Sequence, residues 1–284
     1  ARPTGAGMRI ERRRLSSGTR NGPACCSRGV PYRIMKQIIL AAGYATRLYP
    51  LTENPPKPLL HVGNRPMIEH VISSTAAIGV IDETYIVTNN RFTDQFNHWL
   101  TEYTRTHHNF CGKVINDRTT SNEDRLGAIG DLNLVLTQEN IADDILVVAG
   151  DNLFTGDLSN FGKHCREHRK PVLGVFDVKS LEEAKKYGVV AINESGQINS
   201  FEEKPTQPKS TLIGIALYYY PKEILPEISR YLAEGNNPDQ PGRFVQWLYP
   251  QKPVHTSSIT GNWLDIGSKE TLEAANTLFI NQKE

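Results

Sequence analysis

Short apolar segments alternate with longer amphipathic ones over residues 36–178. The apolar segments indicate buried strands, and the amphipathic ones repeat apolar positions at helical spacing. Predicted strands here are Lys36–Ala42, Thr84–Thr88, Gly112–Asn116, Asp144–Ala149 and Val172–Asp177. Predicted helices are one opened by Pro66 and closed by Gly79, then Thr93–Thr106, Glu123–Glu139 and Leu158–Arg169. This alternation predicts a mostly parallel sheet covered by helices on both faces.

The pattern changes after Tyr187, where strands and turns predominate. Val189–Asn193 and Ile198–Glu203 flank Glu-Ser-Gly-Gln, which predicts a hairpin. The next predicted elements are a strand, Ile213–Tyr220, and a helix near Lys222–Glu234 that Pro226 interrupts. A loop at 235–242 follows. The last predicted elements are a strand pair around Pro253–Asp265 and a terminal helix from Ser268. We expect one three-layer α/β domain with a Rossmann-like mixed sheet, in which residues 35–186 form one half and residues 187–284 a smaller, β-rich half.

Residues 1–34 differ from the rest in pattern and charge. They hold eight Arg and one Glu without any apolar period, so we expect a disordered basic extension. A native basic arm is one interpretation; a vector-derived or wrongly started extension in front of Met35 is the simpler one. The whole chain has a net charge of +1, which leaves the remainder at −6. That sign disfavours binding to nucleic acid.

The 284 residues are 38% hydrophobic and 22% charged, which suffices for a sizeable core. No apolar run approaches the ~20 residues needed to cross a bilayer, so we expect no membrane contact. The four cysteines show neither metal-ligand spacing nor a disulfide framework. This usage favours a reducing, cytoplasmic location.

The strand Lys36–Ala42 leads into a loop of small residues that is followed by Arg47 and, ten residues later, Lys57. A small-residue turn exposes backbone N–H groups to phosphate, and an arginine adds a fork of donors that fits phosphate oxygens. The loop lacks the glycine spacing of a dinucleotide fold and the Gly-Lys-Ser/Thr of a Walker loop. An ordinary strand-to-helix turn with a solvated arginine therefore stays open at this point.

Three further segments place charged residues near predicted strand ends. Asp151 follows the most apolar strand, where open α/β sheets bind ligands and where a carboxylate suits Mg²⁺ if phosphates supply other oxygens. Glu203 and Lys204 end another strand, where they suit a sugar hydroxyl and a sugar phosphate. Asp265 lies between two glycines before the terminal helix, and two such aspartates are able to share one metal ion. Taken singly, a cap, a turn or a solvated charge run explains each segment as well.

In this order the motifs resemble those of the sugar-1-phosphate nucleotidylyltransferases, typified by glucose-1-phosphate thymidylyltransferase and its uridylyl relatives. The resemblance runs from Met35 to about Asn276 and depends on Thr-Arg-Leu, Pro-Leu-Thr and Lys-Pro-Leu-Leu in the loop. It implies Mg²⁺-assisted transfer from a nucleoside triphosphate (dTTP or UTP favoured, CTP also open) to a sugar-1-phosphate, glucose-1-phosphate being favoured. The alternative is a non-catalytic, nucleotide-sensing relative, and formation of a homo-oligomer stays open.

The resemblance also implies roles for individual residues. Those implied for the nucleotide are Ala42, Gly43, Thr46, Arg47, Gly127 and Asp151, and those for the sugar phosphate are Tyr187, Gly188, Glu203, Lys204 and Gly214. Arg47, Lys57 and Lys204 would be the catalytic cations, and Asp151 and Asp265 the Mg²⁺ ligands. Two features depart from the family pattern: Ala42 and Ala45 replace usual glycines, and residues 121–125 lack the glutamine that reads the base. The base is therefore left open.

Overall fold

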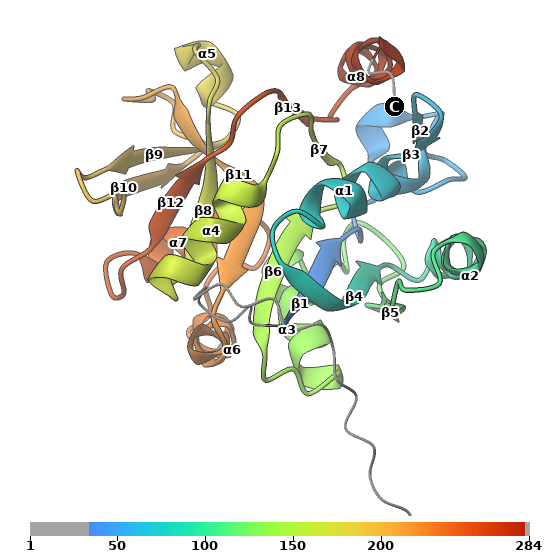
Figure 1. Ribbon diagram of the computed structural model, residues 1–284, viewed down its shortest axis with the longest axis horizontal. Coiled ribbons are helices and arrows are strands. Elements are labelled where there is room, and N and C mark those ends of the chain that lie inside the picture. The colour runs from blue at the N-terminus through green and yellow to red at the C-terminus, as the bar shows by residue number, and fades with distance from the viewer. Residues whose placement is uncertain (1–33, 282–284) are drawn as a thin grey trace, which may run out of the picture. The chain divides into compact units, whose positions relative to one another are not determined.

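The computed structural model describes residues 34–281, which form a three-layer α/β fold built on a mixed nine-stranded sheet (Figure 1). The strand order is β10-β9-β11-β6-β1-β4-β5, with β8 paired to β11 and β12 paired to β8. The strands are β1 (Ile34–Leu40), β4 (Val80–Thr88), β5 (Gly112–Asn116), β6 (Asp144–Ala149), β8 (Val172–Asp177), β9 (Gly188–Ile192), β10 (Ile198–Glu203), β11 (Leu212–Tyr220) and β12 (His255–Ser258). The predicted α/β fold class is confirmed.

The sheet has two differently built parts. Strands β6, β1, β4 and β5 run parallel, so their carboxyl ends reach one edge of the sheet. Strand β11 runs antiparallel to β6, β8 and β9, and β9 pairs antiparallel with β10, as the predicted hairpin requires. In open α/β folds, the loops that bind ligands follow the carboxyl ends of the parallel strands.

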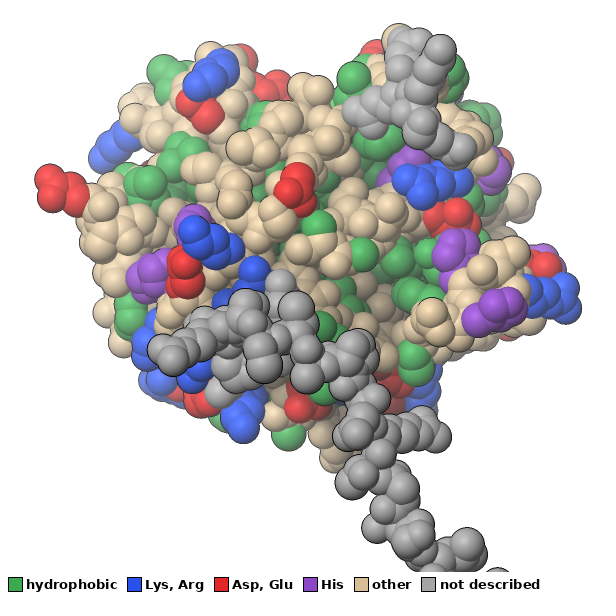
Figure 2. Space-filling view, viewed as in Figure 1, with side chains coloured by type: hydrophobic (Ala, Val, Ile, Leu, Met, Phe, Trp, Pro, Cys, Tyr) green, Lys and Arg blue, Asp and Glu red, His purple; other side chains and the backbone are tan. Residues whose placement is uncertain are grey.

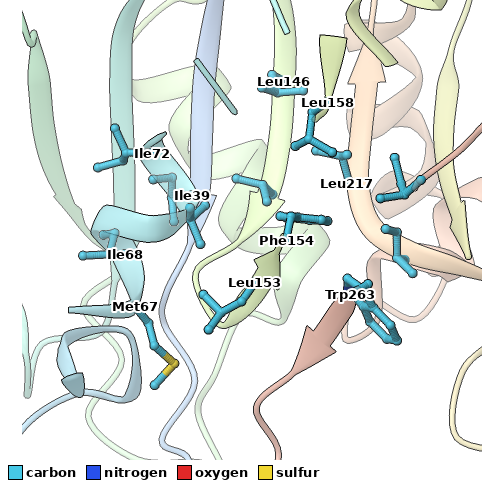
Figure 3. Close-up of a cluster of buried hydrophobic side chains, with 14 of the residues drawn as sticks. Ile39, Met67, Ile68, Ile72, Leu146, Leu153, Phe154, Leu158, Leu217 and Trp263 are labelled. Atoms are coloured by element: carbon cyan, nitrogen blue, oxygen red, sulfur yellow. The ribbon is translucent and has the colours of Figure 1, made fainter. Parts of the chain in front are cut away.

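Helices cover both faces of the sheet. Alternate residues of each strand point to opposite faces, so the strands contribute to two separate cores. Ile39 and Leu146 belong to one core and Ile38 and Val147 to the other. The first core is covered by α1 (Met67–Thr75), α2 (Thr93–Thr106), α4 (Ser159–His168) and α8 (Lys269–Asn281); the second by α3 (Ala128–Gln138), α6 (Leu225–Ala233) and α7 (Pro241–Leu248). Figure 3 shows Ile39 and Leu146 in the first core.

Three predicted helical regions differ in extent. Helix α3 begins five residues later than predicted, because the carboxylate of Asp124 accepts hydrogen bonds from the backbone of Thr120 and Ser121 and forms a turn there. Pro226 does not interrupt a helix: a short 3₁₀ turn, Lys222–Ile224, precedes α6, and the proline stands in the first turn of α6, where its missing N–H costs nothing. The predicted loop at 235–242 ends in α7, whose first residue is Pro241.

The strand pair predicted around Pro253–Asp265 is wrong in its pairing. Strand β12 pairs in parallel with β8, whereas β13 (Trp263–Asp265) pairs antiparallel with β7 (Asn152–Phe154), a short strand that was not predicted. Smaller elements are β2 (His61–Val62), β3 (Arg65–Pro66), the 3₁₀ turns Thr46–Leu48 and Lys57–Leu59, and α5 (Leu181–Ala184). The partners of β7 and β13 are more than a hundred residues apart, so no local pattern indicates them.

The predicted basic extension lies outside the described residues, except that Ile34 is the first residue of β1. Of the helices within residues 34–281, none has the length and apolar character to cross a membrane. Figure 2 shows acidic and basic side chains interspersed over one face, without a single patch of either sign.

Candidate active site

The loops after β1 and β6 meet at the carboxyl edge of the parallel strands. The backbone N–H of Gly150 donates to the carbonyl of Leu40 at 2.9 Å, which keeps the two strand ends side by side. A Cβ added at Gly150 would lie 3.0 Å from the Pro58 ring, so a glycine here permits close approach of the segment that carries Lys57. The Lys57 ammonium consequently lies 2.5 Å from the Asp151 carboxylate, with the two side chains only 13% and 26% exposed.

The β7–β13 pair brings Asp265 to the same place. Asp265 is the register partner of Asn152, and the N–H of Ile266 donates to the carbonyl of Asp151 at 3.2 Å. The indole N–H of Trp263 donates to Asn152 Oδ1 at 2.8 Å, and Asn152 Nδ2 donates to Asp151 Oδ1 at 3.1 Å. This chain of hydrogen bonds fixes the orientation of the Asp151 carboxylate beside Asp265.

Charges of both signs converge on Asp265. Burial, followed by the negative charge of Asp151, raises the pKa of Asp265 to about 6, while Lys57, Lys204 and Arg47 act in the opposite direction. Three cations from three segments therefore lie within electrostatic reach of a pair of carboxylates. Such an arrangement suits a ligand that brings both negative charge and a bound cation.

Arg47 is presented by a turn that contains a strained alanine. Ala45 has φ 49° and ψ 39°, in the left-handed region, which costs a residue with a Cβ about 1 kcal/mol. The turn is held by hydrogen bonds from Thr52 Oγ1 to the Ala45 carbonyl (2.8 Å) and from Asn89 Nδ2 to the Ala42 carbonyl (2.8 Å). Arg47 itself is exposed and has no carboxylate within 4.0 Å among residues 34–281. Its guanidinium is available to an anionic ligand.

A cavity of about 510 Å³ opens beside these charges, lined by residues of β9, β10, β11, β13 and the start of α7 together with Arg47 and Asn152. Seven residues that the sequence singled out line it: Arg47, Tyr187, Gly188, Glu203, Lys204, Gly214 and Asp265. Asp151 and Lys57 are ion-paired with each other, and both act electrostatically on Asp265 in the cavity wall. The cavity therefore joins both halves of the chain at the charged cluster.

The carboxylate of Glu203 occupies a slot between two glycines. A Cβ added at Gly188 or Gly242 would lie 3.0 Å or 2.4 Å from Glu203 Oε2, and both would also meet the Phe201 ring. Phe201 and Glu203 thus share one face of β10, as alternation predicts. Burial raises the pKa of Glu203 despite Lys204 and Arg243, and within the described residues its carboxylate makes no hydrogen bond. Its oxygens are free to accept hydrogen bonds from a bound hydroxyl.

Sequence reasoning missed part of the cavity wall. Asn152, Trp263 and Tyr218 line the cavity, as does the start of α7 at residues 240–242. The available signal was Gly242, because a glycine directly after a helix-starting proline indicates a close approach of another group.

Gly127 lies on the wall of a different hollow, of about 310 Å³, formed with Asn122, Glu123, Arg125 and residues 237–239. Ala42, Gly43 and Thr46 precede Arg47 by five, four and one residues and are not on the wall of the 510 Å³ cavity. Their roles stay predictions.

A buried pair of acids lies beneath the loop that follows β5. Asp117 and Asp131 are 7% and 5% exposed, and Asp117 Oδ1 accepts hydrogen bonds from the backbone and hydroxyl of Thr119. The Thr119 hydroxyl lies 3.3 Å from that of Tyr44 in the loop after β1. Burial, then the nearby Asp117 carboxyl, raises the pKa of Asp131 to about 8. A pKa of about 8 means that Asp131 is protonated at neutral pH, in which form it is able to donate a hydrogen bond to the Asp117 carboxylate.

Replacing Asp131 with asparagine should remove a pH dependence of stability. The folded protein keeps a proton on Asp131 up to about pH 8, whereas the unfolded chain loses it near the ordinary value of 3.8. The folded state therefore binds more protons between these values, and stability falls as pH rises through this window. Denaturant unfolding at pH 5 and pH 9 should show wild type losing at least ~2 kcal/mol more than Asp131→Asn. The exposed variant Asp143→Asn should follow wild type; a parallel loss in Asp131→Asn would contradict the assignment.

The fold and the charged cavity define an α/β protein with a site suited to an anionic ligand, and comparison with known proteins specifies the class. The model of the nucleotidyl transferase family matches residues 36–282, so the chain belongs to that family. It is similar to the bifunctional protein GlmU of Methanocaldococcus jannaschii, with 28% identity over 249 residues that cover 87% of this chain and 55% of that protein. The chain thus spans about half the length of the first such relatives.

Two further similarities cover more of the matched protein. The UTP–glucose-1-phosphate uridylyltransferase AglF of Haloferax volcanii is 28% identical over 190 residues, covering 67% of this chain and 73% of that one. The crystal structure of a putative glucose-1-phosphate thymidylyltransferase from Bacillus anthracis superposes with a TM-score of 0.75 at 24% identity, covering 88% and 97% of the two chains. The latter similarity confirms the fold.

Proposed function

We propose that the protein is a sugar-1-phosphate nucleotidylyltransferase that joins a nucleoside triphosphate to a sugar-1-phosphate and releases pyrophosphate. The observation that carries this proposal is the convergence of Arg47, Lys57 and Lys204 on the paired carboxylates of Asp151 and Asp265. Family membership supports it independently. Two phosphate-bearing substrates need this concentration of cations, whereas a protein that only senses nucleotide does not need the second carboxylate.

The carboxylate oxygens of Asp151 and Asp265 fit Mg²⁺ only if oxygens of the substrates supply the remaining ligands. Within residues 34–281 there is no cluster of three or more His, Cys, Asp or Glu side chains suited to a metal ion. The negative charge of Asp151 raises the pKa of Asp265, and a divalent cation held by the two carboxylates would relieve that repulsion. Oxygen ligands and phosphates are what Mg²⁺ prefers. When bound, it would neutralise charge on the α-phosphate.

The reaction needs positioning and charge neutralisation rather than a base. A phosphate oxygen of the sugar-1-phosphate, already anionic, forms a bond to the α-phosphorus, and the bond to the β-phosphate oxygen breaks to release pyrophosphate. In this proposal Arg47 stabilises the leaving pyrophosphate, and Lys57 and Lys204 hold the attacking phosphate. Preorganised cations of this kind act by electrostatic stabilisation of the transition state.

The sugar would lie in the 510 Å³ cavity, with Glu203 accepting hydrogen bonds from its hydroxyls. Glucose-1-phosphate is the favoured acceptor. For the nucleotide, UTP is supported by the name of the Haloferax relative and dTTP by the sequence resemblance, and CTP is the third candidate.

A pyrophosphate-release screen tests the proposal. UTP, dTTP, CTP and GTP are each combined with a panel of sugar-1-phosphates and with related phosphorylated alcohols, with and without Mg²⁺. We expect release with at least one pair, dependent on both substrates and on Mg²⁺. Nucleotide binding without pyrophosphate release for any pair would instead favour the nucleotide-sensing alternative.

Adding a methyl group at Gly242 should selectively weaken the binding of the sugar-1-phosphate. In Gly242→Ala the new Cβ would lie 2.4 Å from Glu203 Oε2, so the carboxylate must leave its slot. Steady-state kinetics should show KM for the sugar-1-phosphate rising by ~10-fold, which corresponds to about one hydrogen bond, with a smaller change in KM for the nucleotide. Gly79→Ala serves as the control, because its Cβ would approach only the flexible end of Met35. An unchanged sugar-phosphate KM would remove Glu203 from the sugar site.

A further inference from the structure

Residues 236–243, here called the bridging segment, connect two sites that belong to different halves of the chain. At one end the carbonyls of Pro238 and Asp239 accept hydrogen bonds from the backbone N–H groups of Ile129 (2.8 Å) and Ala128 (3.2 Å). These are the first amides of α3, so the segment caps this helix. Gly127 makes the approach possible, because a Cβ there would lie 2.7 Å from the Pro238 carbonyl.

The other end of the bridging segment enters the cavity. Gln240 and Gly242 line it, and Gln240 Oε1 accepts a hydrogen bond from Arg243 Nε at 2.5 Å. Arg243 lies within electrostatic reach of Glu203. Further along α7, Gln246 Oε1 accepts a hydrogen bond from the Glu203 backbone at 3.4 Å. The position of the segment therefore determines the wall that faces Glu203.

Asp239 lies within the bridging segment, between the part that caps α3 and the part that lines the cavity. Its carboxylate receives a two-pronged contact from Arg125, with Nε 3.2 Å from Oδ1 and Nη2 3.2 Å from Oδ2. Gln240 Nε2 also donates to Oδ2, at 2.9 Å. A continuous chain of hydrogen bonds thus runs from Arg125, in the loop before Gly127, through Asp239 and Gln240 to Arg243. Two-pronged arginine–carboxylate contacts fix orientation as well as distance.

We propose that Asp239 is a positioning residue that holds the loop before α3 and the cavity wall in register, so that both substrates are placed together. The Arg125 and Asp239 side chains are 45% and 34% exposed, and an ion pair at that exposure adds little to folding stability. Its effect is instead local: loss of the pair frees the bridging segment from α3 at one end and alters the wall near Glu203 at the other. The kinetic part of this inference rests on the proposed function.

The test compares Asp239→Ala, Arg125→Ala and the double variant with wild type. As matched controls we choose Arg105→Ala and Glu102→Ala, which break an exposed ion pair of 2.8 Å on α2. The first measurement is amide hydrogen exchange at Ala128 and Ile129, which requires no substrate. We expect protection there to fall at least ~10-fold in all three variants, no further in the double variant than in either single one. The controls should leave it unchanged.

The second measurement is steady-state pyrophosphate release with the substrate pair from the screen. Both KM values should rise ~5-fold or more while kcat stays within ~3-fold, because the variants disturb placement and not the reacting groups. Unchanged exchange protection, or changed exchange with unchanged KM values, overturns the positioning role. If wild type releases no pyrophosphate with any pair, the proposed function fails, and the exchange data still decide whether Asp239 holds the bridging segment.

Discussion

Replacing Asp151 with asparagine should lower turnover by at least ~100-fold, the usual cost of removing one preorganised electrostatic group. The shape of the side chain is retained, and its carbonyl oxygen still accepts the hydrogen bond from Asn152 that now orients the carboxylate. What is lost is the negative charge and the oxygen that accepts from the Lys57 ammonium, which an amide NH2 replaces. That charge faces the ammonium of Lys57 at 2.5 Å and the second carboxylate of Asp265, so its loss changes the whole cluster.

The measurement for Asp151→Asn is pyrophosphate release at saturating substrates, followed by a Mg²⁺ titration. If Asp151 holds the cation, the variant should need a higher Mg²⁺ concentration for its residual activity. Asp157→Asn is the matched control, since this aspartate lies six residues away, is exposed, and among the described residues hydrogen-bonds only to Ser159. Near-wild-type turnover in Asp151→Asn would show that the carboxylate is not part of the reacting centre.

The elements that sequence predicted well are those whose signal is local. Strands β6 and β8 are short apolar runs that are largely buried, and β5, β6 and β8 have the predicted limits. Helix α2 also has its predicted limits, because its apolar residues recur at helical spacing. The hairpin of β9 and β10 follows from the turn residues between them.

The errors come from signals that were non-local or ambiguous. The β7–β13 pair depends on two three-residue strands that are stable only because they pack on the first core through residues such as Phe154 and Trp263 (Figure 3). A proline at 226 or 241 is compatible with either a helix start or a break, and only packing decides between them. The late start of α3 depends on a hydrogen-bonded turn at Asp124, which competes with helix formation.

For the candidate site, the sequence indicated which charged residues to consider but not the contacts that hold their side chains in place. Charged residues at strand ends indicated Asp151, Glu203 and Lys204, and the fold places them around one cavity and one cluster. By contrast, the glycine slot for Glu203 and the hydrogen-bonded chain from Trp263 to Asp151 depend on contacts between segments far apart in sequence. Such contacts leave no pattern within a short window, although they determine where each functional side chain points.

Removing the side chain of Arg47 should also lower turnover by at least ~100-fold, with little change in stability. Arg47 lines the cavity, is exposed, and has no carboxylate partner within 4.0 Å among the described residues, so the folded protein does not depend on it. The thermal midpoint of Arg47→Ala should therefore stay within ~2 °C of wild type. A large shift in the midpoint would indicate a structural role instead.

Arg47→Lys separates the charge of Arg47 from its geometry. Lysine keeps the positive charge near Asp265 but lacks the planar fork of donors that fits two phosphate oxygens at once. We expect a loss of ~10-fold in pyrophosphate release for Arg47→Lys, between wild type and Arg47→Ala, and no loss for the exposed control Arg105→Ala on α2. Equal losses in the two Arg47 variants would mean that the fork contributes everything and the charge alone nothing. Wild-type turnover in Arg47→Ala would exclude any contact between this side chain and the reacting phosphates, and the alanine-containing loop would then serve only to connect β1 to the helices that follow.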